Sequence, residues 1–342
     1  MDNLIISETS FTREYNTRII IDSLKNHLSK KNCFYIIDDF FQQSIPHNER
    51  IFWLHALEEE KNISIVGRIV DKMLTENIKR ADTIVAIGGG ITLDIAAFCA
   101  SIYKRGCSLT MIPTTLIAMI DAAIGGKTGV NACSYKNQIG SFYPAAEVII
   151  DFTVLQTLPE KEIKNGFAEL IKIMIIKDRT FFEQTYDDIL MNLHEYIIKA
   201  IRYKIEICQY DFTDKGERQA LNLGHTIAHL IETISNNQIS HGDAVAIGLW
   251  VILQYSQQKK LLSKENKDRF LSYLSHFCNV NSLSIEILEE IKNKGVNILQ
   301  ADKKASELVK LILVNDICVE IHEVDSIDEF IESMVDIVII NS

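Results

Sequence analysis

The sequence has few of the features that mark secreted, membrane-spanning or nucleic-acid-binding proteins. Its seven cysteines are an odd number without a CxxC spacing, which argues against a disulfide framework and predicts reduced thiols in a cytoplasmic protein. No apolar run is long enough to predict a membrane span, and the first residues lack the basic start and apolar core of a secretory signal. Only four prolines occur, so no long proline-rich linker is expected.

Basic residues are also in the minority. Lysine and arginine number 35 against 46 aspartates and glutamates, which gives a net charge of -11. This balance argues against nucleic acid or an anionic membrane as the main partner. A length of 342 residues exceeds what a single core usually supports, so we expect two domains, over 1–158 and 159–342.

The two halves differ in their predicted secondary structure. The first alternates short apolar strands with helices, which predicts a Rossmann-like α/β domain with a parallel sheet. The expected strands are 16–22, 33–38, 83–87, 109–112 and 148–151, and the expected helices are 63–76 and 91–101. The second half is mostly helical, with helices expected over 160–177, 179–210, 218–234, 242–259, 263–277 and 283–293 and a late hairpin over 308–314 and 317–323.

Two glycine-rich turns indicate sites for anionic groups. The strand 83–87 runs into three glycines at 88–90, and the helix that follows carries Asp94 in its first turns, which is typical of a phosphate-binding turn. The second turn is Gly-Gly-Lys at 125–127, and a Lys-Asn pair follows at 136–137 within apolar sequence. Lysines in such surroundings need a negative partner, although solvated surface lysines are the common alternative.

A second group of residues has the chemistry of a metal site. His225 and His229 are four residues apart on one face of a predicted helix, and His241 directly precedes the next helix. Glu169 and Lys172 lie within an apolar helix. One carboxylate with two or three imidazoles is the ligand set of a catalytic zinc ion that keeps a position open for substrate.

A third group consists of cations, each of which alone is most often a solvated side chain. Together with a metal they would suit a substrate that carries both a phosphate and a carboxylate. The group comprises Arg105, Lys127, Lys136, Lys172, Lys204, Arg218, Lys303 and Lys304.

These three groups, in this order, resemble the 3-dehydroquinate synthases of the sugar-phosphate cyclase group. The resemblance extends from about residue 34 to 318. Its most specific pieces are Pro-Thr-Thr at 113–115 with Asp121, Gly-Gly-Lys-Thr-Gly-Val-Asn at 125–131, Lys-Asn at 136–137, Ala-Glu-Leu-Ile-Lys at 168–172, Leu-Asn-Leu-Gly-His-Thr at 221–226, His-Gly at 241–242 and Asp-Lys-Lys at 302–304.

The resemblance implies an NAD-binding N-terminal domain, a helical metal-binding domain and a homodimer. It implies that Zn²⁺ or Co²⁺ is held by Glu169, His225 and His241. It places NAD at Asp38, Glu58, Lys61, Gly89, Gly90, Asp94, Thr114, Thr115, Lys127, Lys136 and Thr157.

The same resemblance implies how the substrate is held. A phosphate site is expected from Lys127, Asn137, Asn222, His229 and one of Lys303 and Lys304, joined by Arg105 of the partner subunit. Lys204 and Arg218 match a clamp for the substrate carboxylate. Asp121, Lys172 and Asp214 are expected to line the remainder of the site.

The implied activity is a carbon-oxygen lyase reaction of the shikimate pathway for aromatic amino acids. It converts 3-deoxy-D-arabino-heptulosonate 7-phosphate to 3-dehydroquinate and phosphate, and NAD is regenerated within the cycle. Three alternatives remain open: another sugar-phosphate cyclase of secondary metabolism, an iron- or zinc-dependent alcohol dehydrogenase, and a non-catalytic descendant. The last is motivated by Leu93, where the family has glycine, and by an altered turn at 133–135.

Overall fold

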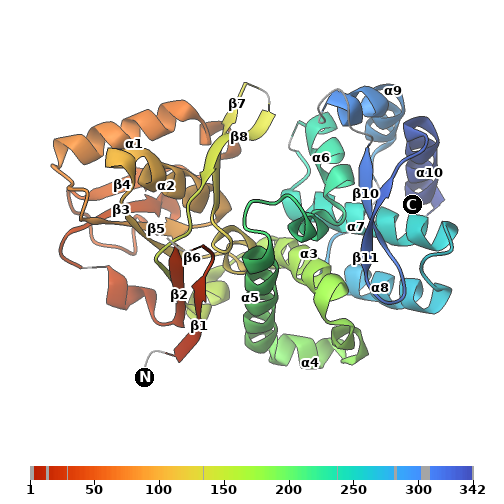
Figure 1. Cartoon of the computed structure of the whole chain (residues 1–342), viewed down its shortest axis with the longest axis horizontal. Coiled ribbons are helices and arrows are strands. Elements are labelled where there is room, and N and C mark those ends of the chain that lie inside the picture. Colours follow the sequence, from red (N-terminus) through yellow and green to blue (C-terminus); the bar gives the residue numbers. More distant parts are fainter. Residues whose placement is uncertain are drawn as a thin grey trace. The chain divides into compact units, whose positions relative to one another are not determined.

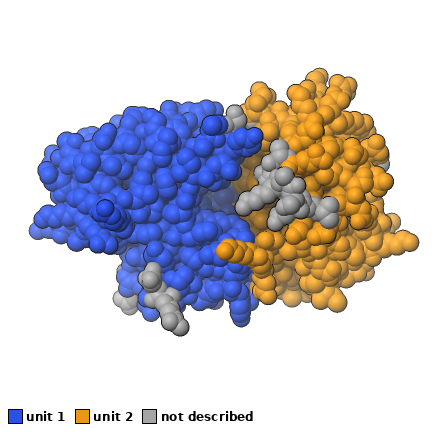
Figure 2. All heavy atoms as spheres, turned by 45° about the horizontal axis from the view of Figure 1, so that its top comes forward, with its two compact units in different colours: residues 1–159, 197–214 blue, residues 160–196, 215–342 orange. Residues whose placement is uncertain are grey.

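The chain forms two compact units, which Figure 2 shows in different colours. The computed structural model describes residues 4–12, 15–28, 30–133, 135–236, 238–280, 283–301 and 309–340. The first unit comprises Met1–Pro159 and Ile197–Asp214, and the second comprises Glu160–Tyr196 and Lys215–Ser342. A single boundary after residue 158 does not describe this division, because residues 197–214 belong to the first unit.

The first unit is built on a seven-stranded sheet in the order β1-β2-β9-β6-β5-β3-β4. Its strands are β1 (Leu4–Ser10), β2 (Asn16–Ile21), β3 (Cys33–Asp38), β4 (Ile51–Leu54), β5 (Thr83–Gly88), β6 (Ser108–Pro113) and β9 (Glu147–Ile150). Only β1 and β2 pair antiparallel, and every other neighbouring pair is parallel. The central strands β3 and β5 are buried along nearly their whole length, as in parallel sheets covered on both faces.

Helices α1 (Ile63–Thr75) and α2 (Gly90–Ile102), a separate hairpin and residues 197–210 of helix α5 (Leu193–Tyr210) also belong to this unit (Figure 1). Helix α1 begins at Asn62, whose side chain accepts hydrogen bonds from two backbone N–H groups of the first turn. Helix α2 follows β5 directly and packs against β5, β6 and β7. Strands β7 (Lys127–Ala132) and β8 (Tyr135–Phe142) form an antiparallel hairpin outside the main sheet.

The second unit is mainly helical. Its helices are α3 (Glu160–Lys177), α4 (Tyr186–Met191), α6 (His225–Ile234), α7 (His241–Gln258), α8 (Lys264–Phe277), α9 (Ile285–Ala301) and α10 (Ile327–Ile340), and α5 (Leu193–Tyr210) links the units. The hairpin of β10 (Lys310–Val314) and β11 (Val319–Glu323) is antiparallel, as predicted. The predicted α/β fold with a mostly helical second half is therefore confirmed. None of the helices in the described ranges combines the length and the apolar character needed to cross a membrane.

The sequence prediction was wrong in several details. The helix expected over 179–210 is three segments, because Thr185 accepts a hydrogen bond from the N–H of Asp188 and starts α4, and α4 ends at Asn192. The helix expected over 218–234 is a 3₁₀ turn at Glu217–Asn222 followed by α6. Strands β1, β4, β7 and β8 and helix α10 were not predicted.

Three helices of the second unit approach one another through glycines. A Cβ added at Gly242 in α7 would lie 2.3 Å from the Cα of Asn165 in α3, and one added at Gly248 would lie 2.2 Å from the carbonyl oxygen of Gly224. Gly224, which precedes α6, has φ of 77°, a conformation that strongly favours glycine. The backbones of α3, α6 and α7 are thus held in direct contact.

We predict that Gly242→Ala lowers the free energy of unfolding, because the new methyl group would force α3 and α7 apart. Overpacking of this kind is destabilising by about 1–3 kcal/mol. Gly67→Ala in α1 is the matched control, since a Cβ there would meet no atom within 4 Å. This control should gain about 0.5–1 kcal/mol from the better helix former. Urea denaturation of both variants tests the prediction, and a Gly242→Ala variant as stable as the wild type would contradict it.

Candidate functional site

Three side chains of the second unit converge as a set of metal ligands. Glu169 projects from α3, whereas His225 and His241 are the first residues of α6 and α7. One ligand atom from each lies within 4.8 Å of those of the other two. The Nε2 atoms of both histidines are 3.4 Å from Oε1 of Glu169. The structure therefore brings together the three residues that sequence reasoning named for the metal.

The carboxylate of Glu169 is fully buried, and its oxygens have no hydrogen-bond partner among the described residues. Lys172 Nζ lies 2.5 Å from Oε2. Burial raises the pKa of Glu169, but the charge of Lys172 and the two histidines outweigh burial and hold it well below its usual value. A buried anion with unsatisfied oxygens fits a divalent cation, and oxygen and imidazole nitrogen are ligands that zinc accepts.

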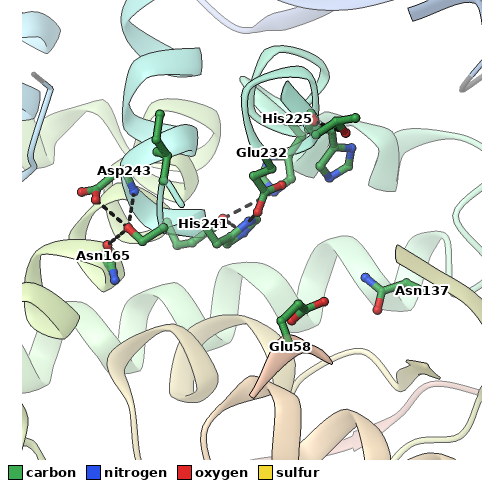
Figure 3. A network of polar contacts seen from close by, with 12 residues as sticks. Glu58, Asn137, Asn165, His225, Glu232, His241 and Asp243 are labelled. Atoms are coloured by element: carbon green, nitrogen blue, oxygen red, sulfur yellow. Dashed lines mark hydrogen bonds and ion pairs between the residues drawn. The ribbon is translucent and has the colours of Figure 1, made fainter. Parts of the chain in front are cut away.

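The two histidine rings are oriented by different groups. Nδ1 of His225 lies 3.2 Å from the carbonyl oxygen of Leu223, and Nδ1 of His241 lies 3.2 Å from Oε1 of Glu232. With Nδ1 as the donor in each case, both Nε2 lone pairs are left for a metal. Figure 3 shows His241 and Glu232 joined by this contact.

The environments of the two rings shift their pKa values in opposite directions. Burial and the charge of Lys172 lower the pKa of His225. Burial also lowers the pKa of His241, but the carboxylates of Glu169 and Glu232 outweigh it and raise the value to about 9. Sequence reasoning missed Glu232, although its position seven residues after His225 places it on the same helix face.

The backbone of His241 is fixed by the start of α7. Ser240 is the N-cap of this helix, and its hydroxyl accepts a hydrogen bond from the N–H of Asp243. The same hydroxyl lies 2.8 Å from Oδ1 of Asn165, which is buried in α3 one turn before Glu169 (Figure 3). The first turn of α7 is therefore tied to the helix that supplies the carboxylate ligand.

In the first unit, Lys61 contacts one residue predicted to bind NAD and one predicted to bind the substrate phosphate. Its ammonium group is buried and donates hydrogen bonds of 2.6 Å to Oδ2 of Asp94 and to Oδ1 of Asn137. Burial raises the pKa of Asp94, and the charge of Lys61 partly offsets this. Asn131, which sequence reasoning did not single out, donates to Oε1 of Glu58 at 2.8 Å and accepts from the N–H of Asn137 at 2.9 Å.

The triple-glycine turn lies at the carboxyl end of β5. Gly89 is the N-cap of α2, and a Cβ there would lie 3.3 Å from the side chain of Thr115. The N–H of Thr114 donates to the carbonyl oxygen of Gly88 at 3.0 Å. Leu93 is fully buried. A strand that ends in a glycine turn at the start of a helix has the geometry to receive a pyrophosphate.

Other predicted residues have local structural partners. Asp38, at the end of β3, accepts a hydrogen bond from the N–H of Phe40 at 3.1 Å, and burial raises its pKa. Thr157 donates to the carbonyl oxygen of Val154 at 2.9 Å. Arg105 is exposed on a turn where its own φ is 64°, and Lys136 is partly buried in β8.

Two of the predicted substrate lysines form ion pairs within the first unit. Lys127 pairs with Asp214, and Lys204 pairs with Asp121. Arg218 is buried in the 3₁₀ turn of the second unit, whereas Asn222 at the end of this turn and His229 in α6 are exposed. The rings of His225 and His229 are 5.7 Å apart. Lys303 and Lys304 lie outside the described residues, and the assignment of all these groups to substrate stays a prediction.

Two sequence-family models match the chain over adjacent ranges. The model of the N-terminal domain of 3-dehydroquinate synthase matches residues 51–165, and that of its C-terminal domain matches residues 166–305. The 3-dehydroquinate synthase of Clostridium perfringens is 38% identical over 267 residues, which are 76% of this chain and 75% of the relative.

Solved structures of sugar-phosphate cyclases share the fold. The 2-epi-5-epi-valiolone synthase of Streptomyces hygroscopicus subsp. jinggangensis, solved with NAD⁺ and Zn²⁺, aligns with a TM-score of 0.81 over 98% of both chains, at 23% identity. A 2-deoxy-scyllo-inosose synthase, solved with carbaglucose-6-phosphate, NAD⁺ and Co²⁺, aligns with a TM-score of 0.76 over 96% of this chain and 98% of its own, at 22% identity. By its two matching domains and its identity with a relative over three quarters of each chain, the protein belongs to the 3-dehydroquinate synthase family.

Proposed function

We propose that this protein is a 3-dehydroquinate synthase, a carbon-oxygen lyase that uses catalytic NAD and a divalent metal. Its substrate would be 3-deoxy-D-arabino-heptulosonate 7-phosphate and its products 3-dehydroquinate and phosphate, in the pathway to the aromatic amino acids. The observation that carries the proposal is the convergence of Glu169, His225 and His241 in a chain of this family. The proposal extends to a cytoplasmic homodimer.

The metal centre would be held by Glu169 and by Nε2 of both histidines. A bound Zn²⁺ or Co²⁺ would act as a Lewis acid and lower the pKa of a coordinated hydroxyl group. Lys172 lies 2.5 Å from Glu169 and would keep this ligand anionic. The carbonyl of Leu223 and the carboxylate of Glu232 would keep the two rings in the tautomer that presents Nε2.

NAD would supply the hydride-transfer chemistry and be regenerated in each cycle. We assign its pyrophosphate to the glycine turn at 88–90 and to Thr114 and Thr115. The group around Lys61, with Glu58 and Asp94, would hold the rest of the cofactor. Asp38, Lys127, Lys136 and Thr157 are the further residues of this assignment.

The substrate would be held at its two charged ends. For the phosphate we propose Lys127, Asn137, Asn222, His229, Lys303 or Lys304, and Arg105 of the partner subunit. For the carboxylate we propose Lys204 and Arg218, because a planar guanidinium matches a carboxylate in two hydrogen bonds. Since Lys127 and Lys204 are already paired with Asp214 and Asp121, substrate binding at these lysines would exchange one anionic partner for another.

The first prediction from this proposed function concerns the reaction itself. Purified protein with Zn²⁺ or Co²⁺ and a catalytic amount of NAD should release phosphate from 3-deoxy-arabino-heptulosonate 7-phosphate without accumulating NADH. A chelator should abolish the release, and added metal should restore it. Accumulating NADH with an alcohol would instead support a dehydrogenase, and turnover only of a sugar phosphate without a carboxylate would support a sister cyclase.

The second prediction concerns the metal. Glu169→Gln replaces the anionic ligand by a neutral one, so the affinity for Zn²⁺ should fall by about 100-fold or more, beyond the 10–100-fold typical of changes next to the ligands. Competition with a chromophoric chelator measures this loss. Glu265→Gln, an exposed carboxylate of α8, is the control and should leave the affinity unchanged. Equal affinities for Glu169→Gln and the wild type would contradict the assignment.

The third prediction separates substrate binding from cofactor binding. Arg218→Ala should raise KM for the substrate by about 10- to 150-fold, which corresponds to the loss of about 1.5–3 kcal/mol for hydrogen bonds to a charged group. The affinity for NAD, measured by calorimetry, should be nearly unchanged. The exposed Arg202→Ala in α5 should alter neither quantity. Equal loss of substrate and NAD binding in Arg218→Ala would refute the clamp.

A further inference from the structure

We propose that Glu232 is a positioning residue of the metal centre, which holds the ring of His241 so that its Nε2 faces the ion. The inference rests on the proposed metal-dependent function. Glu232 lies in the third turn of α6, and its Oε1 is 3.2 Å from Nδ1 of His241 (Figure 3). On the other side of the same ring, Nε2 is 3.4 Å from Glu169. His241 thus lies between two carboxylates, one of which is a ligand and one a support.

The exposure of the two histidine rings explains why they need different supports. The side chain of His225 is only 14% exposed, and a backbone carbonyl is sufficient to orient it. The side chain of His241 is 39% exposed, so surrounding side chains restrict its rotation less. A hydrogen bond to a charged acceptor is roughly twice as strong as one to a neutral acceptor. The more open ring therefore has the stronger partner.

The burial of Glu232 supports the same role. Its side chain is 4% exposed, and a carboxylate removed from water in this way is strongly destabilising unless it has a partner. A carboxylate at this position also increases the basicity of the imidazole and hence its strength as a ligand. The backbone of His241 is held independently, through Ser240 and Asn165. Glu232 thus determines the rotation of the ring rather than the position of the helix.

Two substitutions separate this role from a purely structural one. Glu232→Gln keeps the shape and a neutral acceptor for Nδ1, whereas Glu232→Met keeps the approximate volume without a strong acceptor. The affinity for Zn²⁺, measured by competition with a chromophoric chelator, should fall by about 10–100-fold in the Met variant and by less in the Gln variant. The visible absorption of bound Co²⁺ should shift in the same order, because this spectrum reports the ligand geometry.

A matched control is Ser235→Ala, which removes another buried polar side chain at the end of α6. It should leave metal affinity and the Co²⁺ spectrum unchanged, and NAD affinity should be unchanged in all three variants. Wild-type affinity and spectrum in both Glu232 variants would overturn the proposal, as would an equal loss of metal and NAD binding. If Glu232→Met fails to fold, Glu232→Gln decides by the same criteria. Failure of the proposed function is distinct, since the wild-type protein would then bind the metal without releasing phosphate from 3-deoxy-arabino-heptulosonate 7-phosphate, or would bind no metal at all.

Discussion

The candidate metal centre depends on a buried anion, Glu169, whose oxygens lack hydrogen-bond partners among the described residues. Glu169 is fully buried between the ammonium group of Lys172 and two imidazole rings. Such a group is tolerated only where opposite charge is close, and Lys172 and the ring of His241, whose pKa is raised to about 9, supply it. A divalent cation held by Glu169, His225 and His241 would take over this role once His241 loses the proton from Nε2. The helices α3, α6 and α7, which carry the three candidate ligands, are therefore arranged around the charge of Glu169.

The first unit has a different electrostatic arrangement. Its glycine turn, to which we assign the NAD pyrophosphate, lies at the start of α2. Lys61 is buried and joins α2 to the β7–β8 hairpin through Asp94 and Asn137. We assign Asp94 to the NAD site and Asn137 to the substrate phosphate site. The ammonium group of Lys61 therefore connects the two proposed binding sites. Any ligand that displaces one of these contacts changes the electrostatic environment of the other.

Much of this arrangement could be predicted from the sequence. The buried strands β3 and β5 are continuous apolar runs, and Glu169, His225 and His241 are recognisable by residue type and by their position in known motifs. The hairpin of β7 and β8 was missed because its glycines and lysines do not alternate with apolar residues. Glu232 was missed because a single glutamate on a helix usually lies at the surface, and only the fold shows that it is buried against His241. The break at Thr185 depends on a capping contact that apolar spacing does not reveal.

The glycine contacts between the helices that carry the ligands limit how far substitutions in the surrounding core can move these helices apart. Side chains that separate two helices can adopt other rotamers, so the spacing of such helices drifts when neighbouring core residues are replaced. Gly224 directly precedes His225 and touches the main chain of α7 at Gly248. Gly242 directly follows His241 and touches the main chain of α3 at Asn165. No side chain separates the backbones at these two contacts. The distance of each histidine from the neighbouring ligand helix is consequently set by covalent bond lengths and van der Waals radii, and core substitutions elsewhere should disturb the coordination geometry little.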